Sequence, residues 1–514
     1  MFKIVSLTKF IVMNKPVRVR FAPSPTGPLH IGGVRTALFN YLFAKKHSGT
    51  FYIRIEDTDQ TRFVAEAEDY IFEALEWLGI SPDETIGKNE KFGPYKQSDR
   101  KEIYKQYADE LIQSGWAYYA FDTPEKLDEL RKNAETEGKT FIYNHTVREK
   151  LDTSLNFSEE IVKTRIANGE HFVIRFKTPV NETLHLQDII RGEVQFDTNL
   201  LDDKVLFKSD GMPTYHLANI VDDHLMETSH VIRGEEWLPS MPLHVMLYRA
   251  FGWEAPEFAH LPLILKPIGN GKLSKRDGDK LGFPVFPLQW RDASNTTITN
   301  GYKEAGFFPE AVINFLALLG WNDGTEQEIF SLAELIEKFD LKRIHKSGAK
   351  FDPEKNKWFN HQYLQKQTDE SLAKAFKKIL EEKGISTSFD ITRVVTSIKE
   401  RANFVTEFWD LADYFFVAPT SYDEKAAKNW KEETPEIMKQ VIGQLQNIAD
   451  FNSLNIEALL KEWMTTNEIG MGKVMQPLRL SLVGALKGPH LFDIIELIGK
   501  EETVSRIEKA IASL

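Results

Sequence analysis

Residues Val17–Glu56, VRVRFAPSPTGPLHIGGVRTALFNYLFAKKHSGTFYIRIE, indicate the architecture of the first part of the chain. The alternating run Val17–Phe21 predicts a strand. Ala22–Gly33 holds three prolines and three glycines, which is typical of a loop with a fixed path. We expect a helix over Val34–His47 and a second strand over Thr50–Glu56. This order of elements is typical of a parallel α/β sheet.

The rest of the chain predicts an interrupted sheet followed by helices. Apolar spacing predicts a helix over Thr61–Gly79, with Gly79 as its C-cap. A mixed pattern over 96–213 precedes a buried strand, Val231–Arg233, and a helix, Pro242–Phe251, which indicates an inserted domain. Beyond residue 370 we expect helices over Leu372–Lys383, Thr392–Tyr414, Glu436–Ile448, Ile456–Met464, Leu478–Leu486 and Glu501–Ile511.

The composition predicts a water-soluble globular protein of several domains. The chain has 514 residues, 42% of them hydrophobic and 27% charged. It has no cysteine, which excludes disulfides, thiolate nucleophiles and Cys-based metal sites. The longest apolar stretch, Ala311–Trp321, is shorter than the roughly 18 residues of a membrane span, so we expect no membrane partner. A net charge of −12 disfavours non-specific nucleic-acid binding, although a local basic face can still bind RNA.

Residues 1–16 are predicted to be a non-structural extension. They lack a sustained apolar core and a small-residue cleavage site, so we do not interpret them as a signal peptide. Met13 directly precedes the first predicted strand, so both Met1 and Met13 are candidate starts. We expect a cytoplasmic protein.

The run His30-Ile31-Gly32-Gly33 lies between a predicted strand and a predicted helix. Backbone N–H groups at a helix start favour an anion, and glycines let a phosphate or a flat ring approach the backbone. His30 can donate a hydrogen bond to phosphate oxygens. The alternative is a stiff turn that only connects two elements, because short glycine motifs are weak signals.

The second candidate is Lys272-Leu273-Ser274-Lys275-Arg276, with Gly271 before it and Asp277-Gly278 after it. Phosphoryl and nucleotidyl transfer need positive charge on a transition state that spreads negative charge over its oxygens. A solvated basic loop is the alternative for this run by itself.

Together the two motifs resemble the signatures of class I aminoacyl-tRNA synthetases, and their surroundings resemble the glutamyl-tRNA synthetases of bacterial type. The resemblance rests on RFAPSPTGPLHIGG, IRIEDTD, PTYHLAN, VIRGEEW, KLSKR, FDPEK and GKVMQPLR, in the family's order, and covers the chain from Val17 to its end. It implies a Rossmann-type α/β catalytic domain with an inserted acceptor-binding α/β domain, a helical stem-contact domain and an all-α anticodon-binding domain. The boundaries that we predict are 1–16 for the extension, 17–95 with 214–268, 96–213, 269–369 and 370–514.

The resemblance also assigns a glutamate pocket. Glutamate carries two carboxylates and one ammonium, so its pocket needs arginine for the carboxylates and an acid for the amine. Arg20 and Arg233 are the matching arginines, and Glu56 is the matching acid. The remaining members are Ala22, Ser24, Tyr215 and Asn219. Which arginine takes the side-chain carboxylate stays open at this point.

The family's reaction implies further site residues. ATP with Mg²⁺ would bind His30, Gly32, Gly33, Glu236, Lys272, Lys275 and Arg276. The catalytic residues would be His30, Lys272 and Lys275. Glutamate would attack the α-phosphorus to give glutamyl-adenylate, and tRNA-Glu would then accept the glutamyl group. No protein nucleophile is needed, and we expect a monomer.

Three features depart from the family pattern. The first motif ends in HIGG and lacks a second histidine. The positions that match a cysteine zinc site of many bacterial relatives are Ala120, Asp122 and Val147, so no structural zinc is expected. Asp279–Asn300 is longer than the usual connection, and its prolines and aromatics predict an ordered excursion.

Two further groups of residues could suggest a binding site. His216, Asp222, Asp223, His224 and His230 fit no standard metal-ligand spacing, so we predict no metal site and expect Asp222–His224 to cap a helix end. Leu341–Gln365 carries Lys342, Arg343, Lys346, Lys350, Lys355 and Lys357. With Phe351, Trp358 and Phe359 interleaved, it could hold an RNA backbone and stack on bases; a solvated basic face is the alternative.

Several alternative functions remain. A glutaminyl-tRNA synthetase would end in β-barrels, a short tRNA-modifying paralogue would lack the last domain, and a small-molecule nucleotidyltransferase would not need it. A non-discriminating enzyme that also charges tRNA-Gln stays open. A catalytically inactive RNA-binding relative would be expected to lose His30, Lys275 or the arginines, and all of them are present.

Overall fold

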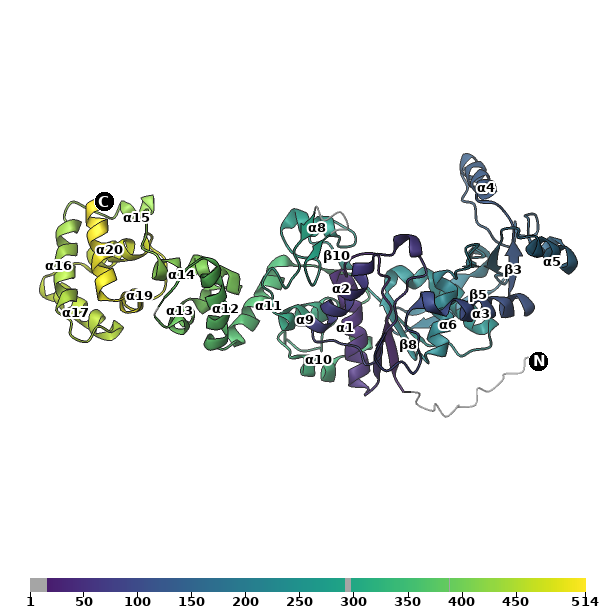
Figure 1. Cartoon of the computed structure of the whole chain (residues 1–514), viewed down its shortest axis with the longest axis horizontal. Helices are drawn as coiled ribbons and strands as arrows, with labels where there is room; N and C mark the ends of the chain where they lie inside the picture. The colour runs from purple at the N-terminus through teal and green to yellow at the C-terminus, as the bar shows by residue number, and fades with distance from the viewer. Residues whose placement is uncertain (1–15, 292–296, 388) are drawn as a thin grey trace. The chain divides into compact units, whose positions relative to one another are not determined.

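The computed structural model describes residues 16–291, 297–387 and 389–514. Residues 1–15 of the predicted extension and 292–296 of the predicted excursion lie outside these ranges. The chain divides into two compact units (Figure 1). The first comprises Met1–Glu304 and Val312–Pro353, and the second comprises Ala305–Ala311 and Glu354–Leu514. The finer domain boundaries drawn from the sequence stay predictions.

The first unit begins with two parallel strands joined by a helix. Strand β1 (Arg18–Phe21) pairs in parallel with β2 (Thr50–Ile53), with Arg20 opposite Tyr52. Helix α1 (Ile31–Lys46) connects them and packs against both. Strand, helix and strand therefore follow the order predicted from the sequence.

The same unit continues in a four-stranded sheet with the order β6-β5-β9-β8. Strands β8 (His230–Gly234) and β9 (Glu257–Leu261) are parallel, and β9 also pairs in parallel with β5 (Thr183–Asp188). Strand β6 (Gly192–Asp197) is antiparallel to β5. Strands β5 and β6 belong to the stretch predicted as inserted, yet they join this sheet.

Strand β1 lies beside the start of β8. The N–H of Ser229 donates to the carbonyl of Arg18 at 2.9 Å, and the N–H of Arg18 donates to the Ser229 hydroxyl at 2.8 Å. The carboxyl ends of β1, β2, β8 and β9 therefore come to one edge. Ligands of open α/β sheets bind at this kind of edge.

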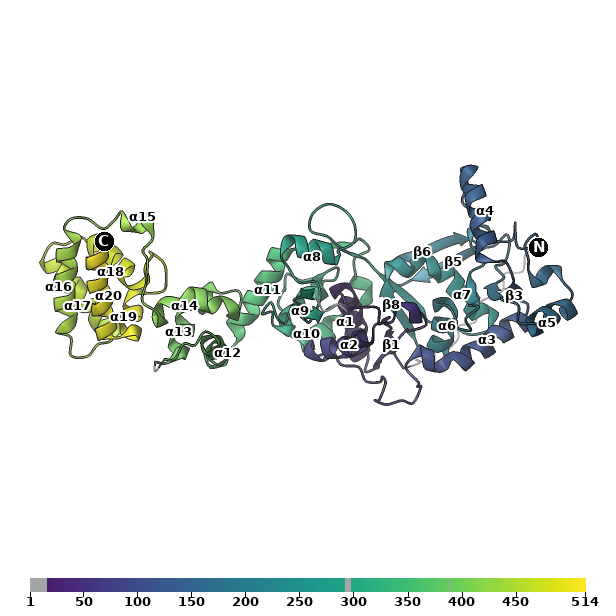
Figure 2. The ribbon, with the colours of Figure 1, turned by 45° about the horizontal axis from the view of Figure 1, so that its top comes forward.

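Helices cover the strands of the first unit (Figure 2). Helices α6 (Tyr215–Leu225) and α7 (Met241–Ala250) share a core with Val231 and Phe258. A three-stranded antiparallel sheet, β3-β4-β7, adds to this unit. The bounds of its strands and of the neighbouring helices are Ala117–Ala120 (β3), Val173–Phe176 (β4), Val205–Phe207 (β7), Ala65–Trp77 (α2), Lys101–Gln113 (α3), Pro124–Thr136 (α4) and Glu159–Ala167 (α5).

The remaining elements follow the sheet. A parallel pair, β10 (Ile264–Leu265) with β13 (Ala349–Lys350), and an antiparallel pair, β11 (Trp290–Arg291) with β12 (Ile298–Thr299), belong to the first unit. The helices α8, α9 and α10 span Lys275–Leu281, Pro309–Leu318 and Leu332–Lys338. Helix α11 spans Pro353–Lys366.

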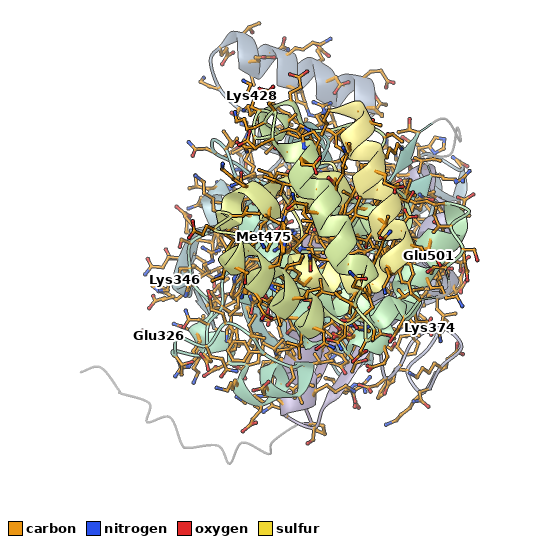
Figure 3. All side chains as sticks on the ribbon, turned by 90° about the vertical axis from the view of Figure 1, so that its left-hand side faces the viewer. Glu326, Lys346, Lys374, Lys428, Met475 and Glu501 are labelled. Carbon is orange, nitrogen blue, oxygen red and sulfur yellow. The ribbon has the colours of Figure 1, made fainter. Side chains whose placement is uncertain are left out.

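The regular secondary structure in the described residues of the second unit is all helical. Its helices are Asp369–Glu382 (α12), Ile391–Ile398 (α13), Phe408–Phe416 (α14), Glu424–Ala427 (α15), Thr434–Gln446 (α16), Ser453–Thr466 (α17), Met471–Val483 (α18), Leu491–Ile498 (α19) and Lys500–Ser513 (α20). Leu364, Phe376, Phe408 and Leu478 belong to one core. Figure 3 shows Lys374, Lys428 and Glu501 among the side chains outside that core.

The start of the first helix differs from the prediction. Helix α1 begins at Ile31 and not at Val34. The imidazole Nδ1 of His30 accepts from the N–H of Gly32 at 3.1 Å, so the ring caps the helix. Gly32 and Gly33 therefore belong to the first turn.

The predicted single helix Thr392–Tyr414 was also wrong. Helix α13 ends at Ile398, and α14 begins only at Phe408. Between them, Asn360 of α11 donates to the carbonyl of Asn403 at 2.7 Å, and the Glu407 carboxylate accepts from the N–H of Asn403 at 2.7 Å. These contacts hold Ala402 and Phe404 extended between two short 3-10 turns, Lys399–Arg401 and Val405–Glu407, at a place where local apolar spacing continues.

Two more helix limits differ from the sequence prediction. The helix expected over Leu478–Leu486 begins at Met471 and ends at Val483, where Gly484 takes a φ of +78°. Helix α19 was not predicted. No helix among the described residues is long and apolar enough to cross a membrane.

Candidate functional site

A cleft of about 1040 Å³ opens at the carboxyl ends of β1, β2, β8 and β9. Of the fourteen predicted site residues, twelve line it: Arg20, Ala22, Ser24, His30, Gly32, Gly33, Glu56, Tyr215, Asn219, Arg233, Glu236 and Lys272. Lys275 and Arg276 follow this lining in the chain but do not contribute to it. The fold thus gathers residues that are more than 200 positions apart.

Backbone hydrogen bonds fix the loop that forms one rim of the cleft. The carbonyl of Pro23 accepts from the N–H of Glu56 at 3.0 Å, and the carbonyl of Pro25 accepts from the N–H of Val64 at 2.9 Å. The loop between β1 and α1 therefore follows the end of β2. This places Ala22 and Ser24 beside Glu56 without a long connection.

His30 presents a neutral ring to the cleft. Burial, reinforced by Lys272, lowers the pKa of His30 to about 4. Because Nδ1 accepts from Gly32, the proton of the neutral ring resides on Nε2. That buried Nε2 has no hydrogen-bond partner among the described residues, so it is available to donate to a ligand.

The two glycines of this motif have different surroundings. A Cβ on Gly33 would lie 2.7 Å from the end of the Leu29 side chain, so any larger residue there would have to displace Leu29. A Cβ on Gly32 would meet only the His30 ring, at 3.5 Å. Gly32 therefore leaves room on the cleft side, where a ligand can approach the backbone.

The expected outward N–H groups at this helix start are already engaged. The N–H of Ile31 donates to the carbonyl of Val285 at 3.0 Å, and that of Gly33 donates to the carbonyl of His30 at 2.8 Å. The N–H of Gly32 is taken by the His30 ring. Phosphate binding would therefore depend on side chains and the helix dipole more than on free amides.

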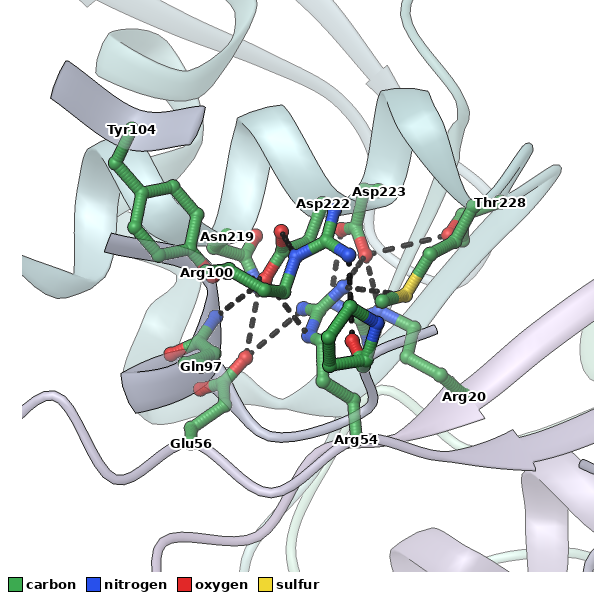
Figure 4. A network of polar contacts seen from close by, with 12 residues as sticks. Arg20, Arg54, Glu56, Gln97, Arg100, Tyr104, Asn219, Asp222, Asp223 and Thr228 are labelled. Carbon is green, nitrogen blue, oxygen red and sulfur yellow. Dashed lines mark hydrogen bonds and ion pairs between the residues drawn. The ribbon is translucent and has the colours of Figure 1, made fainter. Parts of the chain in front are cut away.

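One wall of the cleft rests on buried ion pairs, which we call the paired cluster: Arg20, Arg54, Arg100, Glu56, Asp222 and Asp223 (Figure 4). Arg20 donates to both carboxylate oxygens of Asp223, at 3.0 and 3.1 Å. Arg54 donates to Asp223 at 2.8 Å and to Glu56 at 2.9 Å. Arg100, Gln97 and Tyr104 donate to Asp222 at 2.7, 2.9 and 2.8 Å.

The paired cluster corrects the role expected for Asp222 and Asp223. They do not cap the end of α6, because their carboxylates accept from buried arginines on other elements. Burial would raise the pKa of Asp223, but Arg20 and Arg54 outweigh it and hold that pKa low. Three arginines face three carboxylates, so this wall is internally neutralised.

Beside the paired cluster the cleft offers acceptors. The Asn219 amide donates to Glu56 at 3.3 Å, and its buried oxygen has no partner among the described residues. Burial raises the pKa of Glu56, against the opposing effect of Arg54. An ammonium group would give both side chains a donor.

A second part of the cleft holds what we call the Arg233 cluster: Arg233, Tyr215, His244 and His260. Arg233 donates through Nε to His260 Nε2 at 3.1 Å and through Nη1 to the Tyr215 hydroxyl at 2.9 Å. His244 Nδ1 lies 3.2 Å from the same Nη1. Burial, reinforced by Arg233, lowers the pKa of His244 well below its usual value, so that ring is neutral.

The charge of Arg233 is therefore not compensated by direct contact. Its side chain is only 5% exposed, and its partners are a hydroxyl, two neutral imidazoles and a carbonyl. No carboxylate of the described residues forms an ion pair with it. A buried cation of this kind favours an anionic ligand.

The lysine loop lies at the cleft's edge. Lys272 pairs with Glu236 at 2.7 Å, and both side chains are exposed. Lys275 opens helix α8 and is half-buried, with its ammonium 6.0 Å from the centre of the Phe286 ring. Phe286 also meets His30 edge to face. The second predicted catalytic lysine thus lies next to the first motif but outside the cleft lining.

The predicted excursion packs against the first motif. Besides the Val285 carbonyl, Leu288 exchanges hydrogen bonds with the Tyr70 hydroxyl through both its N–H and its carbonyl, at 3.0 and 2.6 Å. The described part of Asp279–Asn300 therefore holds the start of α1 and the helix α2.

Sequence reasoning missed several cleft residues. Asp57, Asp59, Lys208 and Trp237 line the cleft, and Trp237 lies against Tyr215 with ring centres 4.2 Å apart. Three of them belong to motifs already quoted, IRIEDTD and VIRGEEW, which was a usable signal. Arg54 was also missed, although a charge inside a predicted strand is itself a signal of a buried partner.

Metal-binding chemistry has little support. The described residues contain no group of three or more His, Asp or Glu that could hold a metal ion. Asp122, at a position matched to the zinc site of relatives, accepts from the Tyr143 hydroxyl at 2.8 Å. Nearby, Ala120 is buried in β3.

The predicted base-stacking side chains are only partly suited to RNA. Phe351 and Phe359 are each 1% exposed, so they belong to the packed interior and the expectation for them was wrong. The ammonium of Lys355 covers the Trp358 ring at 3.9 Å. Lys342, Lys346 and Lys350 are exposed.

The fold and the site define a class of protein. It is an enzyme whose α/β sheet brings a helix N-terminus suited to a nucleotide and a cationic loop to one cleft, and whose chain continues in a helical unit. Comparisons with known proteins agree. Residues 16–358 match the family described as tRNA synthetases class I (E and Q), catalytic domain, and residues 370–511 match an anticodon binding domain.

Individual relatives are similar over nearly the whole chain. A glutamate–tRNA ligase of Flavobacterium johnsoniae is 78% identical, over 98% of this chain and 100% of the relative. One of Porphyromonas gingivalis is 55% identical over 98% and 99%. The crystal structure of a glutamate tRNA ligase from Elizabethkingia meningosepticum, in complex with its amino acid, superposes with a TM-score of 0.95 at 53% identity, covering 97% of this chain and 100% of that one.

The chain therefore belongs to the class I tRNA synthetases, in the family of the glutamate–tRNA ligases. The resemblance and the fold class predicted from the sequence are confirmed. Membership of this class implies that the enzyme uses ATP.

Proposed function

We propose that this protein attaches L-glutamate to tRNA-Glu in two ATP-dependent steps. One observation carries the proposal: the cleft combines the uncompensated cation of Arg233 with the carboxylate of Glu56 and the unpartnered amide oxygen of Asn219. An amino acid with an acidic side chain offers a carboxylate to the arginine and an ammonium group to the two acceptors. Arg20 already gives two of its nitrogens to Asp223, so we infer that Arg233 takes the side-chain carboxylate of glutamate.

The reaction requires no protein nucleophile. An oxygen of the glutamate α-carboxylate attacks the α-phosphorus of ATP, and pyrophosphate leaves. The 2′-hydroxyl of the terminal ribose of tRNA then attacks the activated carbonyl, and AMP leaves. The protein's contribution is to hold the reactants in line and to place charge near the phosphates.

His30, Gly32, Gly33 and Glu236 would contact ATP, while Lys272, Lys275 and Arg276 would supply positive charge. The neutral Nε2–H of His30 is a donor without a partner among the described residues. Lys272 can leave its exposed pair with Glu236 at small cost, because such pairs contribute about 0–1 kcal/mol. Mg²⁺ would arrive with ATP, since the described residues offer it no carboxylate cage.

The second unit would read the anticodon, as the matched domain's description suggests. Exposed Lys342, Lys346 and Lys350 would contact the tRNA backbone. We further propose that the enzyme acts in the cytoplasm and that it is a monomer. Light scattering of the purified chain tests the monomeric state directly.

The decisive experiment is charging of purified tRNA-Glu and tRNA-Gln with labelled glutamate, with labelled glutamine as the control. We expect glutamate on tRNA-Glu and no transfer of glutamine. Glutamate on both tRNAs would identify a non-discriminating enzyme. Tight tRNA binding without any charging would overturn the proposal in favour of an RNA-binding relative.

A variant pair tests the lysine loop. Lys275→Ala should reduce kcat for charging by roughly 10²-fold or more, the scale seen when one transition-state donor is lost. Lys280→Ala, on the same short helix and exposed, is the matched control and should retain activity. Equal activity of the two variants would remove Lys275 from the catalytic role.

A further inference from the structure

A buried chain of three side chains ends at Arg233. Asp188 at the end of β5 contacts His260 of β9, with its Oδ2 2.7 Å from Nδ1 of the imidazole. Nε2 of that imidazole accepts from Nε of Arg233 at 3.1 Å. The three residues are 4%, 0% and 5% exposed, so the chain is closed to solvent along its length.

The hydrogen bonds determine the protonation of the imidazole. Arginine has only donors, so Nε2 of His260 must be an acceptor. The single proton of the neutral ring is then on Nδ1, from which it donates to Asp188. Burial lowers the pKa of His260, and Asp188 keeps its own pKa low with the help of this bond and of backbone N–H donors from Ile190 and Arg191.

The imidazole changes what Asp188 does to the arginine. A carboxylate in direct contact would neutralise the guanidinium, as Asp223 does for Arg20. Here a neutral ring separates the charges, so Nε is fixed in place while the positive charge stays available to a ligand. The terminal nitrogens remain on the side of Tyr215, which lines the cleft.

We propose that Asp188 and His260 are positioning residues that orient Arg233 toward the side-chain carboxylate of the amino acid and thereby set the preference for glutamate over glutamine. The inference rests on the proposed function. Neither residue lines the cleft, so both act through Arg233 and not by touching the substrate.

Two substitutions at His260 separate position from packing. In His260→Asn the amide nitrogen replaces Nδ1 and still reaches Asp188, but no acceptor reaches Arg233. In His260→Gln the amide oxygen lies near the place of Nε2 and can accept from Arg233. His230→Gln is the control, because His230 lies on the same strand as Arg233 and its side chain contacts Ser229 and Glu257.

We expect His260→Asn to raise KM for glutamate at least tenfold in tRNA charging, with KM for ATP changed less than twofold. His260→Gln should recover most of this loss, and His230→Gln should behave as the wild type. Calorimetric binding of glutamate to the full chain should weaken in the same order. Discrimination against glutamine should fall in His260→Asn, because the misplaced cation no longer favours a charged side chain.

Equal rises in KM for glutamate and ATP, without recovery in His260→Gln, would overturn the inference in favour of a purely structural role. Unchanged KM in a folded His260→Asn would do the same. If that variant does not fold, Asp188→Asn carries the test, with a rise of two- to fivefold in KM for glutamate expected and no rise overturning the inference. Failure of the wild type to charge tRNA with glutamate would instead remove the proposed function.

Discussion

Two walls of one cleft hold arginines in opposite ways. In the paired cluster, Arg20 and Arg54 are bound directly by Asp223 and Glu56. In the Arg233 cluster, the arginine contacts only uncharged groups among the described residues. Two arginines that the sequence motifs present as alike therefore have different surroundings and different roles.

The difference separates stability from binding. In a fully matched buried ion pair, each charge offsets the desolvation penalty of the other. Removing one member therefore leaves a buried charge without a partner and lowers stability. A buried cation without a counter-ion costs stability in the free protein and gains it back when an anion binds. The members of the paired cluster that do not line the cleft should thus respond to mutation in unfolding experiments, and the Arg233 cluster should respond in substrate titrations.

The largest expected effect is the loss of Arg54. Arg54→Met leaves Asp223 and Glu56 short of a buried cation, and breaking such a pair costs about 3–5 kcal/mol of unfolding free energy. The loss of unfolding free energy is measured by urea unfolding, with hydrogen exchange in β1 and β2 as the probe. Arg131→Met, which removes an exposed pair with Asp128, is the control and should cost less than about 1 kcal/mol. Similar losses in both variants would contradict the distinction.

The next largest effect concerns substrate use. Arg233→Gln should reduce kcat/KM for glutamate by roughly 10²-fold or more, since losing one member of a buried charge pair costs about 2–5 kcal/mol. KM for ATP should change little. The free protein should unfold no more easily than the wild type, because an uncompensated charge has been removed. A marked loss of stability would show that Arg233 is neutralised in the free enzyme.

A matched pair of hydroxyl deletions sharpens the comparison. Tyr104→Phe removes a donor to Asp222 in the paired cluster, and Tyr215→Phe removes an acceptor of Arg233. Each bond involves a charged group and is worth about 1.5–3 kcal/mol. We expect the first change to lower unfolding stability without altering KM for glutamate, and the second to raise that KM roughly tenfold.

Much of the cleft was predictable because its residues belong to short motifs. Arg20 and Arg233 lie near the ends of β1 and β8, and Glu56 follows the end of β2, so the sheet must bring them together. What local sequence cannot show is pairing across the fold: Asp223 meets Arg20 at a separation of 203 residues. The state of each arginine depends on such partners, so the sequence left the choice between Arg20 and Arg233 open.

The errors in secondary structure have the same origin. The break between Ile398 and Phe408 is held by Asn360, a residue of another helix. The early start of α1 depends on a histidine ring as its cap, which is not among the common capping residues. In both places a side chain supplies a hydrogen bond that propensity does not describe.

The last prediction concerns the pH dependence of stability next to the Arg233 cluster. His216 contacts His244 at 3.2 Å, and burial, reinforced by Lys204 and Arg233, lowers the pKa of His216 to about 4. Between pH 6.5 and 4 the unfolded chain therefore binds the proton that the folded chain refuses. Stability is complete above pH 6.5 and falls as the pH decreases toward 4, by at most about 1.4 kcal/mol per pH unit for this group.

Replacing His216 isolates its contribution to the pH dependence of the unfolding free energy. His216→Gln should flatten the decline of unfolding free energy between pH 6.5 and 4.5 relative to the wild type. Asp223 of the paired cluster acts elsewhere on the pH scale, because its pKa is held below its usual 3.8 and its protonation begins only in stronger acid. Acid should thus weaken the contacts of His216 and His244 before the ion pairs of Asp223, with hydrogen exchange of β8 and β9 rising at a higher pH than that of β1 and β2. Simultaneous loss in both walls would mean that the sheet opens as one unit whatever group is protonated first.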